Sequence, residues 1–147
     1  MKILIISPGK THDVLFADAI GEYEKRLQNR FPIEWSFPKP SDKVAEAEAI
    51  IKTLKKDDFV VLLDERGKDM NTPGLAALLD KHLQMGTKRI VFIIGGAFGV
   101  DATLKDWANT TIKLSSLVFP HMLVRLILTE QLYRATSILD GGKYHHA

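Results

Sequence analysis

The sequence predicts an α/β fold in which a mostly parallel sheet is flanked by helices. Residues 2–6, 59–63 and 89–94 are short apolar runs rich in β-branched side chains, which is typical of strands covered on both faces. Between these runs, apolar residues recur at spacings of three and four, the period of amphipathic helices. Regular alternation of strand and helix indicates a parallel α/β sheet. The length of 147 residues suits one domain, residues 1–147.

The first strand, residues 2–6, ends at a Ser-Pro-Gly turn, and the spacing predicts a helix over about residues 13–28. A second strand is predicted over 33–37, where apolar and polar residues alternate. Ser41 or Asp42 then caps a helix, because either side chain can accept hydrogen bonds from free N–H groups of the first turn. The inward face of this helix is expected to carry Val44, Ala47, Ile51 and Leu54.

The third strand, residues 59–63, is followed by a turn-rich loop over 64–68. Thr72 and Pro73 are a favourable pair for the N-cap and the first position of a third helix. Gly86 is expected to end that helix, since glycine adopts the left-handed conformation common at helix C-termini.

The fourth strand, residues 89–94, leads directly into a glycine-rich segment. Asp101 is expected to cap a short helix, and a fifth strand is predicted over 111–115.

The last predicted helix is unusually apolar. Pro120 suits its first turn, because the N–H that proline lacks needs no partner there. Apolar residues then fall on more than one face at helical spacing, although the segment is too short and too charged to cross a membrane. A helix that needs so much cover predicts a subunit interface, with Leu128 as one candidate position. Its apolar residues are Met122, Leu123, Val124, Leu126, Ile127, Leu128, Leu132 and Tyr133.

The composition is that of an ordinary globular protein, with 46% hydrophobic and 26% charged residues. There is no cysteine, so disulfides and thiolate chemistry are excluded, and no His, Asp or Glu cluster has the spacing of a metal site. The N-terminal apolar run is too short for a signal peptide, so we expect a cytoplasmic protein. A net charge of +2 means that any RNA site must be a local patch.

Two glycine segments follow predicted strands, and only one suits a ligand. The segment starting at Gly9 resembles the end of a phosphate-binding loop, but Leu4 stands where the required first glycine would be. Gly95 begins the other segment, which is not a dinucleotide-binding fingerprint and could be a simple turn. However, Leu63, Gly95 and Leu114 all end strands at one edge of a parallel sheet, where α/β proteins bind ligands. An apolar, glycine-lined cleft there suits a small cofactor.

Several motifs together resemble the RlmH family of SPOUT-superfamily methyltransferases, and the resemblance extends over the whole chain. Any one motif is weakly specific, but their joint occurrence in this order is far more so. Phe98 departs from the family, which often has a polar or acidic residue there. The motifs are L-D-E-R-G-K from Leu63, I-G-G-A-F-G from Ile94, L-S-x-L-x-F-P-H from Leu114, V-R at Val124, E-Q-L-Y-R-A from Glu130 and Y-H-H from Tyr144.

The resemblance implies a homodimer with a C-terminal trefoil knot that uses S-adenosyl-L-methionine to methylate N3 of a pseudouridine in 23S rRNA of the large subunit or ribosome. Knots are contrary to the usual rules of chain topology, so this expectation comes from the resemblance alone. By position, the family implies cofactor contacts from Leu63, Gly95, Leu114, Ser115, Ser116, Leu117, Val118 and Phe119. The candidates for handling the N3 proton or stabilising an anion are His121, Arg125, Tyr144 and His145, in a site shared across the dimer.

Simpler interpretations stay open for individual residues and for the function. His121 could only buttress the helix, Arg134 could only pair with Glu130, and residues 144–146 could be a frayed end. A knotted tRNA methyltransferase would keep the cofactor cleft and change the substrate. A non-catalytic α/β module that binds RNA or the ribosome would not need a glycine-lined edge spanning three strand ends.

Overall fold

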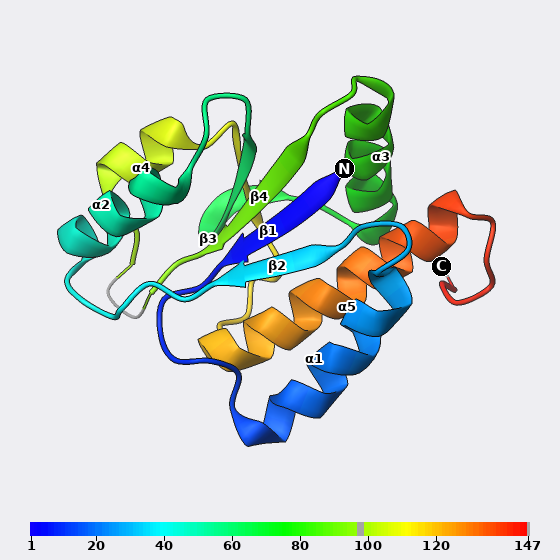
Figure 1. Cartoon of the computed structure of the whole chain (residues 1–147), viewed down its shortest axis with the longest axis horizontal. Helices are drawn as coiled ribbons and strands as arrows, with labels where there is room; N and C mark the ends of the chain where they lie inside the picture. The colour runs from blue at the N-terminus through cyan, green and yellow to red at the C-terminus, as the bar shows by residue number, and fades with distance from the viewer. Residues whose placement is uncertain (97–98, 147) are drawn as a thin grey trace.

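The computed structural model describes residues 1–96 and 99–146 and confirms the α/β class. Its sheet has five strands in the order β2-β1-β4-β3-β5, and every neighbouring pair is parallel. β1 and β4 are neighbours at the centre of the sheet, β2 lies beside β1, and β3 and β5 lie beyond β4. Helices connect the successive strands (Figure 1). The strands are β1 (Lys2–Ile6), β2 (Ile33–Ser36), β3 (Phe59–Asp69), β4 (Arg89–Ile94) and β5 (Thr110–Lys113).

Helices cover both faces of the sheet, as strands with continuous apolar runs require. One face is covered by two short helices and the other by three longer ones, with α1 lying along α5 (Figure 1). The short helices are α2 (Lys43–Thr53) and α4 (Ala102–Trp107). The longer ones are α1 (Val14–Leu27), α3 (Thr72–Gln84) and α5 (His121–Leu139).

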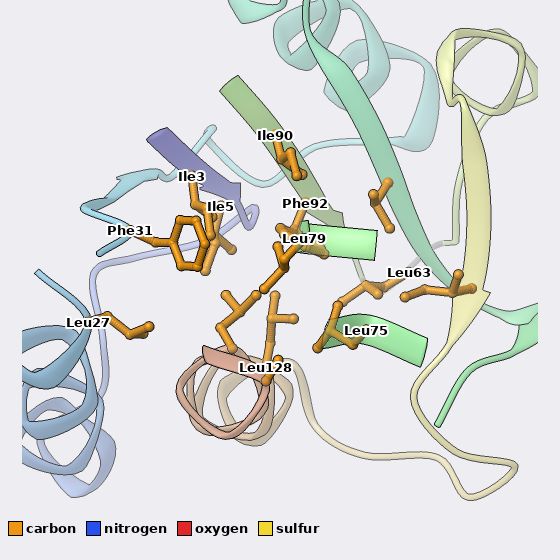
Figure 2. Close-up of a cluster of buried hydrophobic side chains, with 14 of the residues drawn as sticks. Ile3, Ile5, Leu27, Phe31, Leu63, Leu75, Leu79, Ile90, Phe92 and Leu128 are labelled. Carbon is orange, nitrogen blue, oxygen red and sulfur yellow. The ribbon is translucent and has the colours of Figure 1, made fainter. Parts of the chain in front are cut away.

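The alternation of side chains along each strand divides the interior into two apolar clusters. In β1, Ile3 and Ile5 face the cluster beneath α1, α3 and α5, while Leu4 and Ile6 face the smaller cluster beneath α2 and α4. Figure 2 shows the larger cluster, where Phe92 of β4 lies among side chains from the helices on this face. Both clusters reach β3 and β4, so the sheet centre is buried on both sides.

The segment 64–68, predicted to be a loop, instead continues β3 to Asp69. Leu63 and Lys68 both pair with Ile112 of β5, so the residues between them form an irregularity in the ladder. Gly67 makes this possible, because a Cβ there would lie 2.6–2.8 Å from backbone atoms of Ile112. The turn-forming residues were recognised correctly, but pairing with β5 outweighs their local preference.

Three helix details also differ from the sequence prediction. Val44 is 51% exposed and does not face inward as predicted, whereas Ala47 is buried and Ile51 and Leu54 pack partly buried against the smaller cluster. The helix also buries Glu46 and Ile50, which were not predicted to face inward. The N-cap of α3 is Asn71, whose side chain accepts a hydrogen bond from Gly74 N–H, and not the predicted Thr72. Pro120 is the N-cap of α5 and lies just outside its first turn. The predicted Asp42 and Asp101 caps are confirmed.

The C-terminal helix α5 buries one stripe of its side chains against its own chain. Leu128 is 1% exposed within the single chain and packs under the sheet, so its proposed place in a subunit interface is wrong. Leu123, Leu126 and Ile127 are only partly buried and belong to neither apolar cluster. No helix in the described part of the chain has the length and apolar character needed to span a membrane.

His82 of α3 provides a test of this packing. Its ring is 4% exposed, Nδ1 lies 2.8 Å from Thr87 Oγ1, and the ring centroid lies 3.9 Å from that of Phe59. Burial, with a smaller contribution from Lys81, lowers the pKa of His82 below 6.5. The unfolded chain therefore binds this proton more readily, so the contribution of His82 to stability is complete above pH about 6.5 and is lost as the pH falls toward the folded pKa.

We expect the free energy of unfolding to fall between about pH 7.5 and about pH 5, and to fall less in His82→Gln. Urea unfolding of both proteins at the two pH values measures the difference. The pKa of His12 is also lowered, so some pH dependence should persist in the variant. An identical pH dependence in both proteins would show that His82 does not contribute.

Candidate cofactor site

A cavity of about 460 Å³ opens at the carboxyl edge of the sheet, where the sequence predicted a ligand site. It forms because Leu63 pairs with Ile94, the last residue of β4, and with Ile112 of β5, so β4 and β5 end beside the irregular part of β3. The segment after β5 crosses this edge before α5 begins. Of the predicted cofactor contacts, the cavity is lined by Leu63, Gly95, Leu114, Ser115, Leu117, Val118 and Phe119.

Ser116 is the exception among the predicted contacts. Its side chain is turned toward Lys113, whose Nζ donates to Ser116 Oγ at 3.2 Å, and the residue is exposed. Ser115 has a local role, since its Oγ accepts a hydrogen bond from Leu117 N–H at 2.9 Å. This turn presents Leu117 and Val118 at 70% and 82% exposure, so apolar surface remains available at the mouth of the cavity.

The glycine segment after β4 comes close to other parts of the chain. A Cβ on Gly95 would lie 2.8 Å from Val100 Cγ2, and one on Gly96 would collide with the carboxylate of Glu46. Gly99 has a φ of +84°, which favours glycine. A turn alone would explain Gly99. At Gly95 and Gly96, the side chains of Val100 and Glu46 occupy the space that a Cβ would need. Ala97 and Phe98, in the middle of the motif, lie outside the described residues.

Charged residues at the cavity were missed by sequence reasoning, which took only Leu63 from its motif. Asp64, Glu65 and Arg66 also line the cavity, since β3 continues past its edge. Asp64 accepts a hydrogen bond from Arg66 N–H at 3.0 Å and lies 4.0 Å from Lys105 Nζ. The signal available in the sequence was their position directly after a buried strand.

Arg125 is fully buried and is not among the residues that line the cavity. Its guanidinium donates to Ser7 Oγ at 2.8 Å and to the Lys10 carbonyl at 2.9 Å, and it lies 4.6 Å from the Phe37 ring centroid. Arg125 takes part in no ion pair in the described part of the chain, and burial lowers its pKa. The contacts show Arg125 binding the β1–α1 loop to the start of α5.

His121, at the first position of α5, lines the cavity and is exposed. Gly9 lies against it, because a Cβ on Gly9 would be 3.5 Å from His121 Nε2 and 3.4 Å from Arg125 Nη2. His12 was not predicted as a site residue, yet its Nδ1 lies 3.5 Å from Arg125 Nη1. Burial first, and then the Arg125 charge, lower the pKa of His12 and favour the neutral imidazole.

The C-terminal segment is folded back on its own chain, at the other end of α5 (Figure 1). The Tyr144 hydroxyl donates to Glu130 Oε1 at 3.1 Å, and its ring lies 4.8 Å from that of Tyr133. Its hydrogen bond with Tyr23, together with burial and Glu130, raises the pKa of Tyr144. The predicted pair of Glu130 and Arg134 is confirmed at 2.5 Å, and the Arg134 guanidinium also covers Tyr144.

The structure therefore separates the predicted site residues into two groups within one chain. His121 lies at the cavity, with Arg125 behind it, whereas Tyr144 packs beside Tyr133, about 18 Å further along α5 at 1.5 Å per residue. His145 Nδ1 is buried and has no hydrogen-bond partner in the described part of the chain. No group of three metal-ligating side chains was found among residues 1–96 and 99–146.

Known proteins match this chain along its whole length. A family model described as a predicted SPOUT methyltransferase matches residues 1–145. The chain belongs to the SPOUT methyltransferase family. Relatives named ribosomal RNA large subunit methyltransferase H include those of Parabacteroides distasonis, 37% identical, and Bacteroides fragilis, 38% identical, with 99% of each protein covered. The relative of the same name from Geotalea daltonii is 37% identical, with 99% of this chain and 100% of that protein covered.

The crowding at Gly95 gives a direct test of the cavity. Gly95→Val places a branched side chain against Val100 at the edge of the cavity, so a ligand held there should lose at least about tenfold in affinity, about 1.4 kcal/mol. Calorimetric titration with S-adenosyl-L-methionine measures the change, and circular dichroism checks the fold. Gly21→Ala is a matched control, because a Cβ there meets nothing within 4 Å. Equal affinity in Gly95→Val would contradict the proposed site.

Proposed function

We propose that this chain is an S-adenosyl-L-methionine-dependent 23S rRNA methyltransferase that acts at N3 of a pseudouridine in the large subunit or assembled ribosome. The observation that carries the proposal is the cavity at the carboxyl ends of β3, β4 and β5, in a chain that is 37% identical over its full length to a ribosomal RNA large subunit methyltransferase H. The pseudouridine and its N3 atom come from the family resemblance. The enzyme would act in the cytoplasm, as a single domain.

The reaction requires little from the protein beyond placement and a proton acceptor. The cofactor, held against Leu63, Gly95 and Leu114, would supply an electrophilic methyl group, and its transfer to N3 would leave the electron pair of the broken carbon–sulfur bond on sulfur. N3 also loses its proton, which passes to a base or to water. The protein must hold the two reactants in line and exclude water. We propose that His121, which is exposed and lines the cavity, accepts this proton directly or through one water.

Arg125 fits this function as a residue that positions the site and does not touch substrate. It has no exposed surface, and its donors are occupied by the β1–α1 loop. By holding Ser7 and Lys10, it keeps Gly9 against His121. The charge of Arg125 still contributes to the local potential, because a buried cation is weakly screened.

A homodimer is supported by the outer face of α5. Leu123, Leu126 and Ile127 are partly exposed and follow one another at helical spacing. Apolar side chains at the same end of the molecule, Leu117 and Val118, are more exposed still. A two-fold axis across α5 would cover this surface with the same surface of a second copy.

The same two-fold axis would bring together site residues that lie far apart within one chain. If two α5 helices pack antiparallel, the end of one lies beside the start of the other. Tyr144 and His145 of one subunit would then approach the cavity and His121 of its partner. A tyrosine ring can stack on a base, and a neutral histidine can accept a proton. We therefore assign the tail to the partner's site.

A map of rRNA modifications by mass spectrometry tests the function. Cells that lack the gene should lose one methyl group from a large-subunit pseudouridine, and the wild-type gene should restore it. The gene carrying Gly95→Val should fail to restore it. A loss confined to tRNA would favour a knotted tRNA methyltransferase, and a map without any change would favour a non-catalytic ribosome-binding module.

Mixed dimers test whether the tail acts on the partner subunit. One subunit carries Gly95→Val, and the other lacks residues 144–147. Either homodimer should be inactive, but the mixed dimer should regain up to about half of wild-type activity, since its intact cavity faces an intact tail across the two-fold axis. Methyl transfer to ribosomes by doubly tagged, purified dimers is the measurement. An inactive mixed dimer would place the tail in its own subunit, and sedimentation as a monomer would refute the dimer.

A further inference from the structure

Glu46 is a buried acidic residue whose position has no explanation in the core of the protein. It lies in the first turn of α2, is 5% exposed, and faces inward between the helix and the edge of the sheet. One carboxylate oxygen, Oε2, accepts a hydrogen bond from Ser41 N–H at 3.0 Å. The other, Oε1, lies against Gly96 so closely that a Cβ on that glycine would collide with it.

Among residues 1–96 and 99–146, the Glu46 carboxylate forms no ion pair with a cationic side chain. Burying a charge without a partner is costly, and the N-terminus of α2 offsets only part of that cost. The hydrogen bond from Ser41 N–H could be explained as capping at the start of α2. Capping does not require a buried carboxylate next to the glycine segment, because exposed residues cap helices equally well.

The cavity beside Gly96 is where a positive charge could balance Glu46. Gly96 lines the cavity and also lies against the Glu46 carboxylate, so this residue connects Glu46 to the space proposed for the cofactor. The charged side chains that line the cavity are Asp64, Glu65 and Arg66, with a net charge of −1. Glu46 adds a further negative charge from behind. The surroundings therefore favour a cation.

We propose that Glu46 is a specificity-determining residue whose buried carboxylate favours the positively charged cofactor over its uncharged product. This inference rests on the proposed function. S-adenosyl-L-methionine carries a sulfonium and a net charge of +1, whereas S-adenosylhomocysteine has a neutral thioether and no net charge. A carboxylate in a poorly solvated position interacts with that charge more strongly than one in water. Glu46 does not touch the reacting atoms, because Gly96 lies between.

The test is the ratio of the affinities for the two compounds, measured by calorimetry at one ionic strength. Glu46→Gln keeps the size of the side chain and an oxygen that can accept from Ser41 N–H, but removes the charge. It should weaken S-adenosyl-L-methionine about tenfold and change S-adenosylhomocysteine by less than about twofold. Glu46→Asp, which keeps the charge, should retain most of the wild-type ratio. Glu48→Gln is the control, since it removes the same charge from an exposed position of α2.

A second variant serves if Glu46→Gln does not fold. In Glu46→Ala/Gly96→Ala, the new methyl group at residue 96 occupies space that the carboxylate has left, and the affinity ratio should fall in the same way. Equal losses for both compounds, or an unchanged ratio in the folded variants, would overturn the inference and leave Glu46 as a helix cap. If the wild-type protein binds neither compound, the proposed function itself fails.

Discussion

The parallel pairing of β3 with both β4 and β5 is the constraint on which the site depends. Because Leu63 is opposite Ile94 on one side and Ile112 on the other, β4 and β5 end beside the irregular part of β3, and the chain after β4 and β5 turns there. These turns make the cavity. The same pairing fixes the irregularity in β3, where Gly67 allows the backbone of Ile112 to pass close by. A residue with a side chain at position 67 would push β5 away from the edge that it helps to form.

Two buried charges of opposite sign lie behind the site, and neither forms an ion pair in the described part of the chain. Arg125 is held by a hydroxyl and a backbone carbonyl, and Glu46 by a backbone N–H. Each therefore costs desolvation energy that a conventional salt bridge would partly offset. Each also lies beside a glycine: a Cβ on Gly96 would collide with Glu46, and one on Gly9 would be in ordinary contact with Arg125. The two buried charges and the glycine backbone beside them together shape the site, and this is why glycines recur around it.

His121 and Tyr144 lie at opposite ends of α5, so this helix connects the two groups of predicted site residues as well as covering the sheet. Its buried stripe, which includes Leu128, Leu132 and Ala135, completes the core of its own chain. Its remaining face carries apolar residues at the cavity end and the Glu130–Arg134 pair, which binds Tyr144, at the other. A helix that is too apolar for a free surface and polar at one end is suited to symmetric pairing, where each end meets the opposite end of its partner.

The sequence by itself determined the strands, most helix boundaries and the edge at which the cavity forms, because these follow from local periodicity and from the rule that parallel strands end together. Seven of the eight predicted cofactor contacts line the cavity, and only Ser116 does not. The tertiary structure alone decided the extension of β3, the burial of Arg125 and Glu46, and the separation of the tail from the cavity. Each of these depends on contacts between segments far apart in the chain, such as Arg125 with Ser7 or Glu46 with Gly96, which no local pattern encodes.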